Sequence, residues 1–236
     1  MNVNIEASPF LLIAHRGGLF YRPENTRAAF SHIVERGVRW IETDVRMTHD
    51  GVLVLCHDDR VTMPSGDLEA VRDLTYRQLR SHDAGGGETI MRLKDLLDEF
   101  GGRLSFDLEI KELDVVPKTV DLLREYRLER RVFLSSFMPE AMQEARELAP
   151  EIDRGLLVDR VVGRLVGGKG AVNAAILLDC RYFLPHLNRI SASWVQTAHD
   201  AGMKVIPWTV NRPEDMKRMI SLGVDGVISD RPDNLL

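Results

Sequence analysis

The sequence predicts an α/β fold, a (β/α)8 TIM barrel with a β-hairpin at its mouth after the second barrel strand, formed by one domain over residues 1–236. Three observations lead to it. β-rich runs alternate with helical patterns from end to end, nine such runs are present, and one pair of runs is joined by very few residues. Strand–helix alternation predicts a parallel sheet with helical crossovers. An open, doubly wound sheet is the alternative.

The predicted strands are short runs rich in branched and aromatic residues. They are Phe10–Ala14, Arg39–Val45, Val52–Cys56, Leu104–Ile110, Val132–Ser135, Gly155–Val158, Ala175–Leu178, Lys204–Val210 and Asp225–Ile228. Helical patterns lie between most of them, and several end at a glycine such as Gly37 or Gly101. The predicted helices are Thr26–Arg36, Leu93–Phe100, Val115–Tyr126, Pro139–Leu148, Ser191–Ala201 and Pro213–Leu222.

The second and third runs must pair with each other as a hairpin. Only Arg46 to Gly51 separate them, and a parallel crossover needs a dozen or more residues. Removing this return strand leaves the eight strands of a barrel. With Asp50 and Gly51 as a two-residue turn, Asp44 faces His57, and such partners point to one face of the hairpin. Two looser stretches, 64–88 and 161–173, are expected to be loop insertions.

The composition argues against binding to nucleic acid and against insertion into a membrane. Lys and Arg number 31 against 36 Asp and Glu, a formal charge of −5, which argues against a nucleic-acid partner. The apolar runs are about five residues long, whereas a membrane span needs roughly 20. Residues 1–6 lack the features of a signal peptide, and the two cysteines are far apart, so we expect reduced thiols in a cytoplasmic protein without stable membrane insertion.

Carboxylates gather where the predicted strands end, which is where barrels of this class place their active sites. Glu42 and Asp44 are two residues apart and point to the same side of their strand, as do Glu109 and Lys111. Three converging carboxylates form a site for one hard divalent cation, Mg²⁺ or Ca²⁺. The alternative is that these groups form salt bridges with Arg39, Arg46 or Lys111.

Two histidines and two positively charged side chains lie at the ends of predicted strands, at the same mouth of the barrel. His15 and His57 suit a reaction that needs one base and one acid, because histidine exchanges protons near neutral pH. Arg16 and Lys111 are both phosphate-binding types, although they could instead neutralise the carboxylates. Trp208 is either core or an apolar wall for the substrate. The remaining histidines fall on helices or loops and are expected to be structural, and Asp230 is as well explained by a structural cap as by a functional role.

At these residues the chain closely resembles the glycerophosphodiester phosphodiesterase family. The matching elements occur in family order over nearly the whole chain, and the ordered set is specific although each element alone is weak. They are His15-Arg16-Gly17, Pro23-Glu24-Asn25-Thr26 with Ala29-Phe30, Gly37 before Glu42-Thr43-Asp44-Val45, Thr48-His49-Asp50-Gly51, Val54-Leu55-Cys56-His57-Asp58, Glu109-Ile110-Lys111, Ser136-Phe137, Trp208-Thr209-Val210-Asn211, and Gly223 to Pro232.

The resemblance implies a metal held by Glu42, Asp44 and Glu109, acid–base roles for His15 and His57, and phosphate contact by Arg16 and Lys111. It also implies a small inserted segment at the barrel mouth over about residues 58–88. The reaction it implies releases sn-glycerol 3-phosphate and an alcohol from a glycerophosphodiester. Two alternatives are a lysophospholipase D-type activity on the same barrel and a catalytically silent phosphate-ligand binding protein. The chain departs from the family pattern at 60–66 and 90–93, in the segment expected to cover the pocket and to contact the alcohol.

Overall fold

A computed structural model of the chain describes residues 10–159, 161 and 167–235. Residues 1–6, for which we expect no leader peptide, lie outside the described residues, as does the centre of the predicted insertion at 161–173. In the part of the chain that is described, no helix is both long enough and apolar enough to cross a bilayer.

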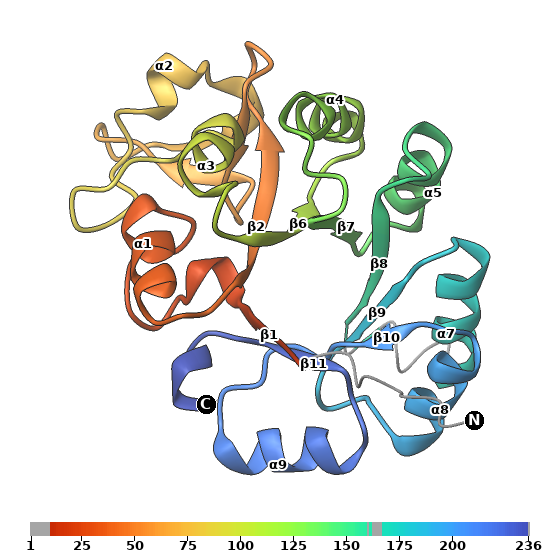
Figure 1. Cartoon of the computed structure of the whole chain (residues 1–236). Coiled ribbons are helices and arrows are strands. Elements are labelled where there is room, and N and C mark those ends of the chain that lie inside the picture. The colour runs from red at the N-terminus through yellow and green to blue at the C-terminus, as the bar shows by residue number, and fades with distance from the viewer. Residues whose placement is uncertain (1–9, 160, 162–166, 236) are drawn as a thin grey trace.

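Eight parallel strands form the barrel, and the predicted fold class is confirmed (Figure 1). Their order around the sheet is β10-β9-β8-β7-β6-β2-β1-β11. Because these strands run in parallel, their carboxyl ends all meet at one end of the barrel, which we call the mouth. The bounds are β1 (Leu11–Ala14), β2 (Trp40–Met47), β6 (Ser105–Ile110), β7 (Val132–Ser136), β8 (Asp153–Val158), β9 (Tyr182–Pro185), β10 (Lys204–Val205) and β11 (Gly226–Ser229).

Backbone hydrogen bonds close the ring between β10 and β11. Asp225 N–H donates to the Val205 carbonyl at 2.9 Å, Ile228 N–H to Pro207 at 3.0 Å, and Val210 N–H to Ile228 at 2.9 Å. The segment predicted as the strand Lys204–Val210 therefore completes the barrel, although only its first two residues have regular strand geometry. A closed ring has no free edges, so the alternative of an open doubly wound sheet is wrong.

Helices cover the outside of the barrel (Figure 1). They are α1 (Arg27–Glu35), α3 (Leu93–Phe100), α4 (Val116–Tyr126), α5 (Pro139–Leu148), α7 (Gly167–Leu177), α8 (Ala192–Asp200) and α9 (Pro213–Ser221). The six predicted helices are confirmed to within two residues. Their starts follow from local chemistry: the Thr26 hydroxyl accepts the Ala29 N–H, and prolines occupy the first turns of α4, α5 and α9.

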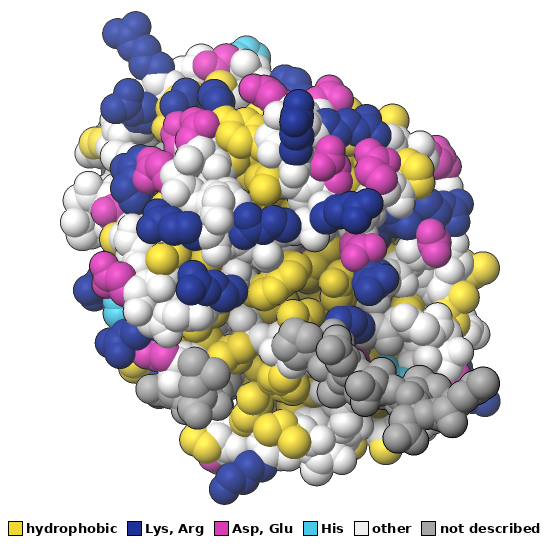
Figure 2. Space-filling view, viewed as in Figure 1, with side chains coloured by type: hydrophobic (Ala, Val, Ile, Leu, Met, Phe, Trp, Pro, Cys, Tyr) yellow, Lys and Arg dark blue, Asp and Glu magenta, His cyan; other side chains and the backbone are white. Residues whose placement is uncertain are grey.

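Two apolar layers hold these elements together. Between helices and barrel the core includes fully buried Phe30, Phe100 and Phe106. Inside the barrel, Phe133 stacks on Tyr182 with ring centroids 4.2 Å apart. Figure 2, viewed along the same direction as Figure 1, shows charged side chains of both signs around the rim of this face and hydrophobic atoms nearer its centre. The interior is mainly apolar, but it also holds the buried Asp107, which accepts a hydrogen bond from the Ser135 hydroxyl at 2.5 Å.

One predicted strand is wrong. Ala175–Leu177 forms the end of α7, Leu178 belongs to the following turn, in which Asp179 has φ 52°, and the strand of this unit is β9, Tyr182–Pro185. A short apolar run does not distinguish strand from helix by periodicity, and the alanines before Ile176 favour helix.

The predicted register of the hairpin is also wrong. β3 (Leu53–Leu55) pairs with β2 so that Val45 faces Leu55, and Cys56 N–H bonds the Asp44 carbonyl at 3.1 Å. Asp44 thus does not face His57. The loop has three residues rather than two, because Gly51 N–H bonds the Thr48 carbonyl while Gly51 takes φ 77°. A one-residue slip reverses the face of every side chain on the return strand, and His57 lies beyond the end of β3.

The segment after the hairpin forms a small unit beside the mouth, which agrees with the predicted insertion. It contains an antiparallel pair, β4 (Arg60–Thr62) and β5 (Leu68–Ala70), followed by α2 (Tyr76–Leu79). Its own apolar cluster is built on Val54, Val61, Val71, Leu74, Leu79 and Ile90. Short 3-10 turns complete the fold at His15–Gly17, Val71–Asp73, Leu113–Val115 and Pro232–Leu235.

Candidate active site

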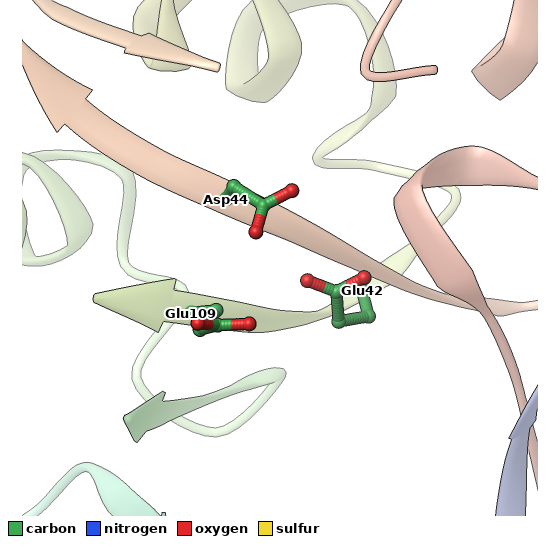
Figure 3. Close-up of side chains that lie close together, drawn as sticks. All are labelled: Glu42, Asp44 and Glu109. Atoms are coloured by element: carbon green, nitrogen blue, oxygen red, sulfur yellow. The ribbon is translucent and has the colours of Figure 1, made fainter. Parts of the chain in front are cut away.

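Three buried carboxyl groups converge at the mouth. Glu42 and Asp44 alternate along β2 and share a face, and Asp44 is the register partner of Glu109 on β6. One oxygen from each of the three lies within 4.8 Å of the others. Figure 3 shows the three carboxyl groups gathered over these two neighbouring strands. The parallel β2–β6 register is therefore what brings residues 65 positions apart into one cluster.

The electrostatics of this cluster fit a cation. Burial, together with the charges of Asp44 and Glu109, raises the pKa of Glu42 well above its usual value. Burial also raises the pKa of Glu109, although Lys111 opposes this shift. Glu42 Oε1 is buried without a hydrogen-bond partner among the described residues, and Asp44 Oδ1 has the Lys111 ammonium 3.3 Å away but no hydrogen bond. An all-oxygen donor set with an unpartnered oxygen suits a hard divalent ion such as Mg²⁺ or Ca²⁺.

Two side-chain cations adjoin the carboxylates. Lys111 Nζ lies 2.6 Å from Glu109 Oε1 and 3.3 Å from Asp44 Oδ1. Burial works to raise the pKa of Asp44, but the charges of Lys111 and Arg16 outweigh it and lower the pKa. The salt-bridge alternative thus holds for Lys111. It does not hold for Arg46, which binds Glu112 and the carbonyl of His57. Among the described residues, the Arg39 side chain forms no ion pair with these carboxylates.

Arg16 takes an unusual backbone conformation that serves the cluster. Its φ of 51° lies in the left-handed region, and its N–H donates to Glu42 Oε2 at 2.9 Å. The guanidinium reaches Glu24 at 2.9 Å and lies 3.7 Å from Asp44. Asn25, which follows Glu24, donates from Nδ2 to Asp44 Oδ2 at 2.9 Å. The segment after β1 therefore orients two of the three carboxylates.

His15 is held by a carboxylate behind its ring. Its Nδ1 lies 2.5 Å from Asp230 Oδ1, and Asn211 Nδ2 donates to the other Asp230 oxygen at 2.6 Å. Burial opposes ionisation of Asp230, but the hydrogen bond and charge of His15 lower its pKa, so the ionised carboxylate accepts a hydrogen bond from the Nδ1–H group. The free Nε2 then faces the cluster, 3.8 Å from Glu42 Oε2.

His57 has a parallel arrangement. Asp58 Oδ1 lies 2.7 Å from His57 Nδ1, while Arg46 donates to the His57 carbonyl at 2.8 Å and fixes the backbone. The ring contributes to a cavity of about 330 Å³ that His15, Arg16, Glu42 and Glu109 also line. Two imidazoles, each with one nitrogen bound to a carboxylate, thus share a cavity with the acidic cluster.

One side of this cavity is apolar. Trp208 packs edge-on against Phe137 with ring centroids 5.4 Å apart, and its indole N–H donates to the Leu184 carbonyl. Leu157 and Ile228 extend the wall. This arrangement places Trp208 at the wall of the cavity rather than only in the barrel core.

All eight site residues predicted from the sequence lie at this mouth. Six line the cavity, and Asp44 and Lys111 contact the cluster from beside it. Sequence reasoning gave no role to Asn25 or Phe137, although both lie in motifs of the family resemblance, and left the role of Asp230 open. None of the other histidines lines the cavity: for example, His199 binds Asp225 and His186 packs on Trp208.

Comparisons with known proteins give a consistent result. The model of the glycerophosphoryl diester phosphodiesterase family matches residues 15–234. A glycerophosphodiester phosphodiesterase of Caldanaerobacter subterraneus subsp. tengcongensis is 34% identical, over 96% of each chain. An Oleispira antarctica phosphodiesterase, solved in complex with the product sn-glycerol-3-phosphate, is 27% identical with a TM-score of 0.83, over 95% of this chain and 94% of that one. A lysophospholipase D of Mus musculus is 25% identical, over 95% of this chain and 80% of that protein.

Proposed function

The chain belongs to the glycerophosphoryl diester phosphodiesterase family, and from that premise we propose that it hydrolyses a glycerophosphodiester to sn-glycerol 3-phosphate and a free alcohol. The observation that carries this proposal is the shared cavity in which His15 and His57 meet the cluster of Glu42, Asp44 and Glu109. A phosphodiester bound in this cavity would have acid–base groups and a cation site within reach at the same time. The catalytic unit is the single domain of residues 1–236.

The cation site consists of Glu42, Asp44 and Glu109, and Mg²⁺ or Ca²⁺ is its occupant. The chemistry that a bound cation supplies is polarisation of a non-bridging phosphoryl oxygen. Lys111 and Arg16 border the cluster, and their remaining N–H groups are available to the other phosphoryl oxygens. These two side chains therefore both balance the carboxylates and hold the phosphate.

The two imidazoles divide the proton transfers. One takes a proton from the nucleophile, either water or the 2-hydroxyl of the substrate glycerol, as its oxygen attacks phosphorus. Attack by water gives glycerol 3-phosphate directly, whereas attack by the 2-hydroxyl gives a cyclic phosphate that a water molecule then opens to glycerol 3-phosphate. The other imidazole gives a proton to the alcohol oxygen as the phosphorus–oxygen bond breaks and the bond pair stays on that oxygen. Each transfer is worth about 10²- to 10⁴-fold in rate. Asp230 and Asp58 hold the two rings with Nε2 free for this work.

The apolar wall of Phe137 and Trp208 contacts the carbon skeleton of the glycerol. This wall also supports a second candidate, a lysophospholipid substrate, because Phe137 is 39% exposed and an acyl chain could extend over it towards solvent. The relative with lysophospholipase D activity favours the same candidate. A catalytically silent binding protein is the weaker alternative, since every side chain that the reaction requires is present.

The cytoplasm is the compartment that we propose, because Cys56 and Cys180 are free thiols. The proposed binding partner is the small-molecule glycerophosphodiester substrate.

Release of glycerol 3-phosphate tests the proposal. Purified protein with glycerophosphocholine and Mg²⁺ or Ca²⁺ should release glycerol 3-phosphate and choline, and a chelator should stop the release. Lysophosphatidylcholine in place of glycerophosphocholine tests the second candidate. Binding of glycerophosphocholine without release of glycerol 3-phosphate under any of these conditions would contradict catalysis and favour a binding protein.

A further inference from the structure

The two imidazoles of the site differ in how firmly their carboxylate partners are held. Asp230, behind His15, has a side chain that is 20% exposed and also accepts a hydrogen bond from Asn211. Asp58, behind His57, has a side chain that is 78% exposed. A carboxylate exposed to this extent contributes little to fixing a ring, because water competes for its hydrogen bonds. A defined position for His57 therefore requires another anchor.

A buried arginine anchors His57 through its backbone. The Arg46 side chain is 10% exposed, and it donates to the His57 carbonyl from Nη2 at 2.8 Å and from Nε at 3.2 Å. His57 lies beyond the end of β3, so strand pairing does not hold this carbonyl. Among the described residues, no other group donates a hydrogen bond to it. The position of the His57 backbone thus depends on the Arg46 guanidinium.

Glu112 holds the other side of the same guanidinium. Its Oε1 accepts from Arg46 Nη1 at 2.8 Å, and its side chain is only 15% exposed. Glu112 directly follows Lys111, whose ammonium borders the acidic cluster. The Arg46 side chain therefore connects the segment that carries His57 to the segment that carries Lys111. The planar fork of a guanidinium can bind both segments at once, whereas the point charge of a lysine ammonium does not reproduce this geometry.

From these contacts we infer that Arg46 and Glu112 are positioning residues, which together fix the His57 imidazole relative to the Lys111 ammonium. The inference rests on the proposed function, in which both of these groups act on the phosphate. Neither Arg46 nor Glu112 lines the cavity, so neither touches the substrate. Proton transfer requires the imidazole within hydrogen-bond reach, and a displacement of about 1 Å can cost about 10²-fold in rate. Loss of Arg46 should therefore lower kcat rather than weaken binding of substrate or cation.

The alternative role for a buried ion pair is stability alone, and the chain offers a matched control for it. Arg154 lies at the start of β8, at the end of the barrel opposite the mouth, and is 3% exposed. Its guanidinium donates to the carbonyls of Ile152 and Asp179 and to the Asp179 carboxylate. Arg154→Gln therefore removes the same kinds of contact as Arg46→Gln, but far from the site.

Steady-state release of glycerol 3-phosphate from glycerophosphocholine separates the two roles. We expect Arg46→Gln to lower kcat by about 10²-fold, with KM and the dissociation constant for Ca²⁺ changed by less than about threefold. Arg154→Gln should lower the melting temperature but keep kcat within about threefold of the wild type. Equal kcat values of the two variants, at a temperature where both are folded, would refute the inference.

Two milder variants test the same connection. Arg46→Lys keeps the charge without the fork, and its kcat should lie between those of the wild type and Arg46→Gln. Glu112→Ala leaves Arg46 in place but removes the partner that orients it, and should lower kcat by about tenfold. Wild-type kcat in Glu112→Ala would remove Glu112 from the positioning role.

A double-mutant cycle tests whether Arg46 acts through His57. In the His57→Ala protein no imidazole remains to be placed, so adding Arg46→Gln should lower kcat by less than about threefold further. A further loss as large as in the wild-type background would refute the positioning role.

The imidazole signals of His57 in an NMR spectrum give a measurement that does not depend on turnover. His57→Ala identifies these signals by their loss. Arg46→Gln should shift or broaden them, whereas Arg154→Gln should leave them unchanged, and unchanged signals in Arg46→Gln would refute the inference. Failure of the wild-type protein to release glycerol 3-phosphate would instead refute the proposed function, so the two failures are distinguishable.

Discussion

Replacing Asp230 by asparagine tests how His15 is prepared for proton transfer. In the structure one Asp230 oxygen faces His15 Nδ1 at 2.5 Å and the other accepts from Asn211 Nδ2 at 2.6 Å. An asparagine has one acceptor and one donor in place of these two acceptors. With its oxygen towards Asn211, its amide N–H groups face Nδ1, and His15 must move its proton to Nε2 to restore a hydrogen bond.

A His15 ring protonated on Nε2 cannot act as a base toward the cavity. If His15 acts as the acid instead, the variant makes the protonated imidazolium less stable, because the carboxylate that stabilises its charge has been removed. Loss of one acid–base group corresponds to about 10²- to 10⁴-fold in kcat. The free energy of unfolding should fall by about 1–3 kcal/mol, as for one mismatched buried hydrogen bond, so the protein remains folded.

The assay is steady-state release of glycerol 3-phosphate from glycerophosphocholine. We expect Asp230→Asn to lower kcat by about 10²-fold or more with KM changed by less than about threefold. Asp233→Asn is the control, because Asp233 contacts Tyr21 and Arg36 rather than His15. A kcat for Asp230→Asn within about threefold of wild type would refute the role assigned to the His15–Asp230 contact.

Three further predictions concern the same site and the thiols. His57→Ala should lower kcat by about 10²-fold or more while the dissociation constant for Ca²⁺, measured by calorimetry, changes little; a large loss of Ca²⁺ affinity would place His57 among the ligands. Because burial raises the pKa of Glu42, cation binding should release a proton, and the affinity for the cation should fall as the pH falls. Calorimetry in buffers of different ionisation enthalpy measures the number of protons released. An absence of proton release would contradict this prediction. Burial raises the pKa of Cys56 and Cys180 to about 12, so iodoacetamide at pH 8 should label the folded protein much more slowly than the unfolded chain, as mass spectrometry can show; equal rates would contradict it.

Strand and helix patterns were enough to predict the barrel because they repeat along the chain. The hairpin register was not predictable in the same way. A turn at Asp50-Gly51 fits a two-residue loop and a three-residue loop equally well, and the hydrogen bond from Gly51 to Thr48 decides between them. The strand at Tyr182–Pro185 was missed because the apolar run just before it, at the end of α7, resembles a strand of the same length.

The candidate site shows a similar division. Two-residue spacing along a strand is sufficient to place Glu42 and Asp44 on one side, and strand order brings Glu109 beside them. The partners that orient the catalytic candidates depend on contacts between distant segments. Asp230 reaches His15 across 215 positions, and Asn25 reaches Asp44 through the left-handed turn at Arg16, so no local pattern indicates either contact.

Cation binding tests the central claim most directly, which is that Glu42, Asp44 and Glu109 together hold one divalent ion at the mouth. Calorimetric titration of the purified protein with Ca²⁺ and with Mg²⁺ should give one site per chain. Glu42→Gln should weaken that site by at least about tenfold, since it removes one charged ligand, whereas Glu112→Gln, just outside the cluster, should bind as the wild type does. Equal binding by Glu42→Gln and the wild type, or no binding of either ion by the wild type, would contradict the account.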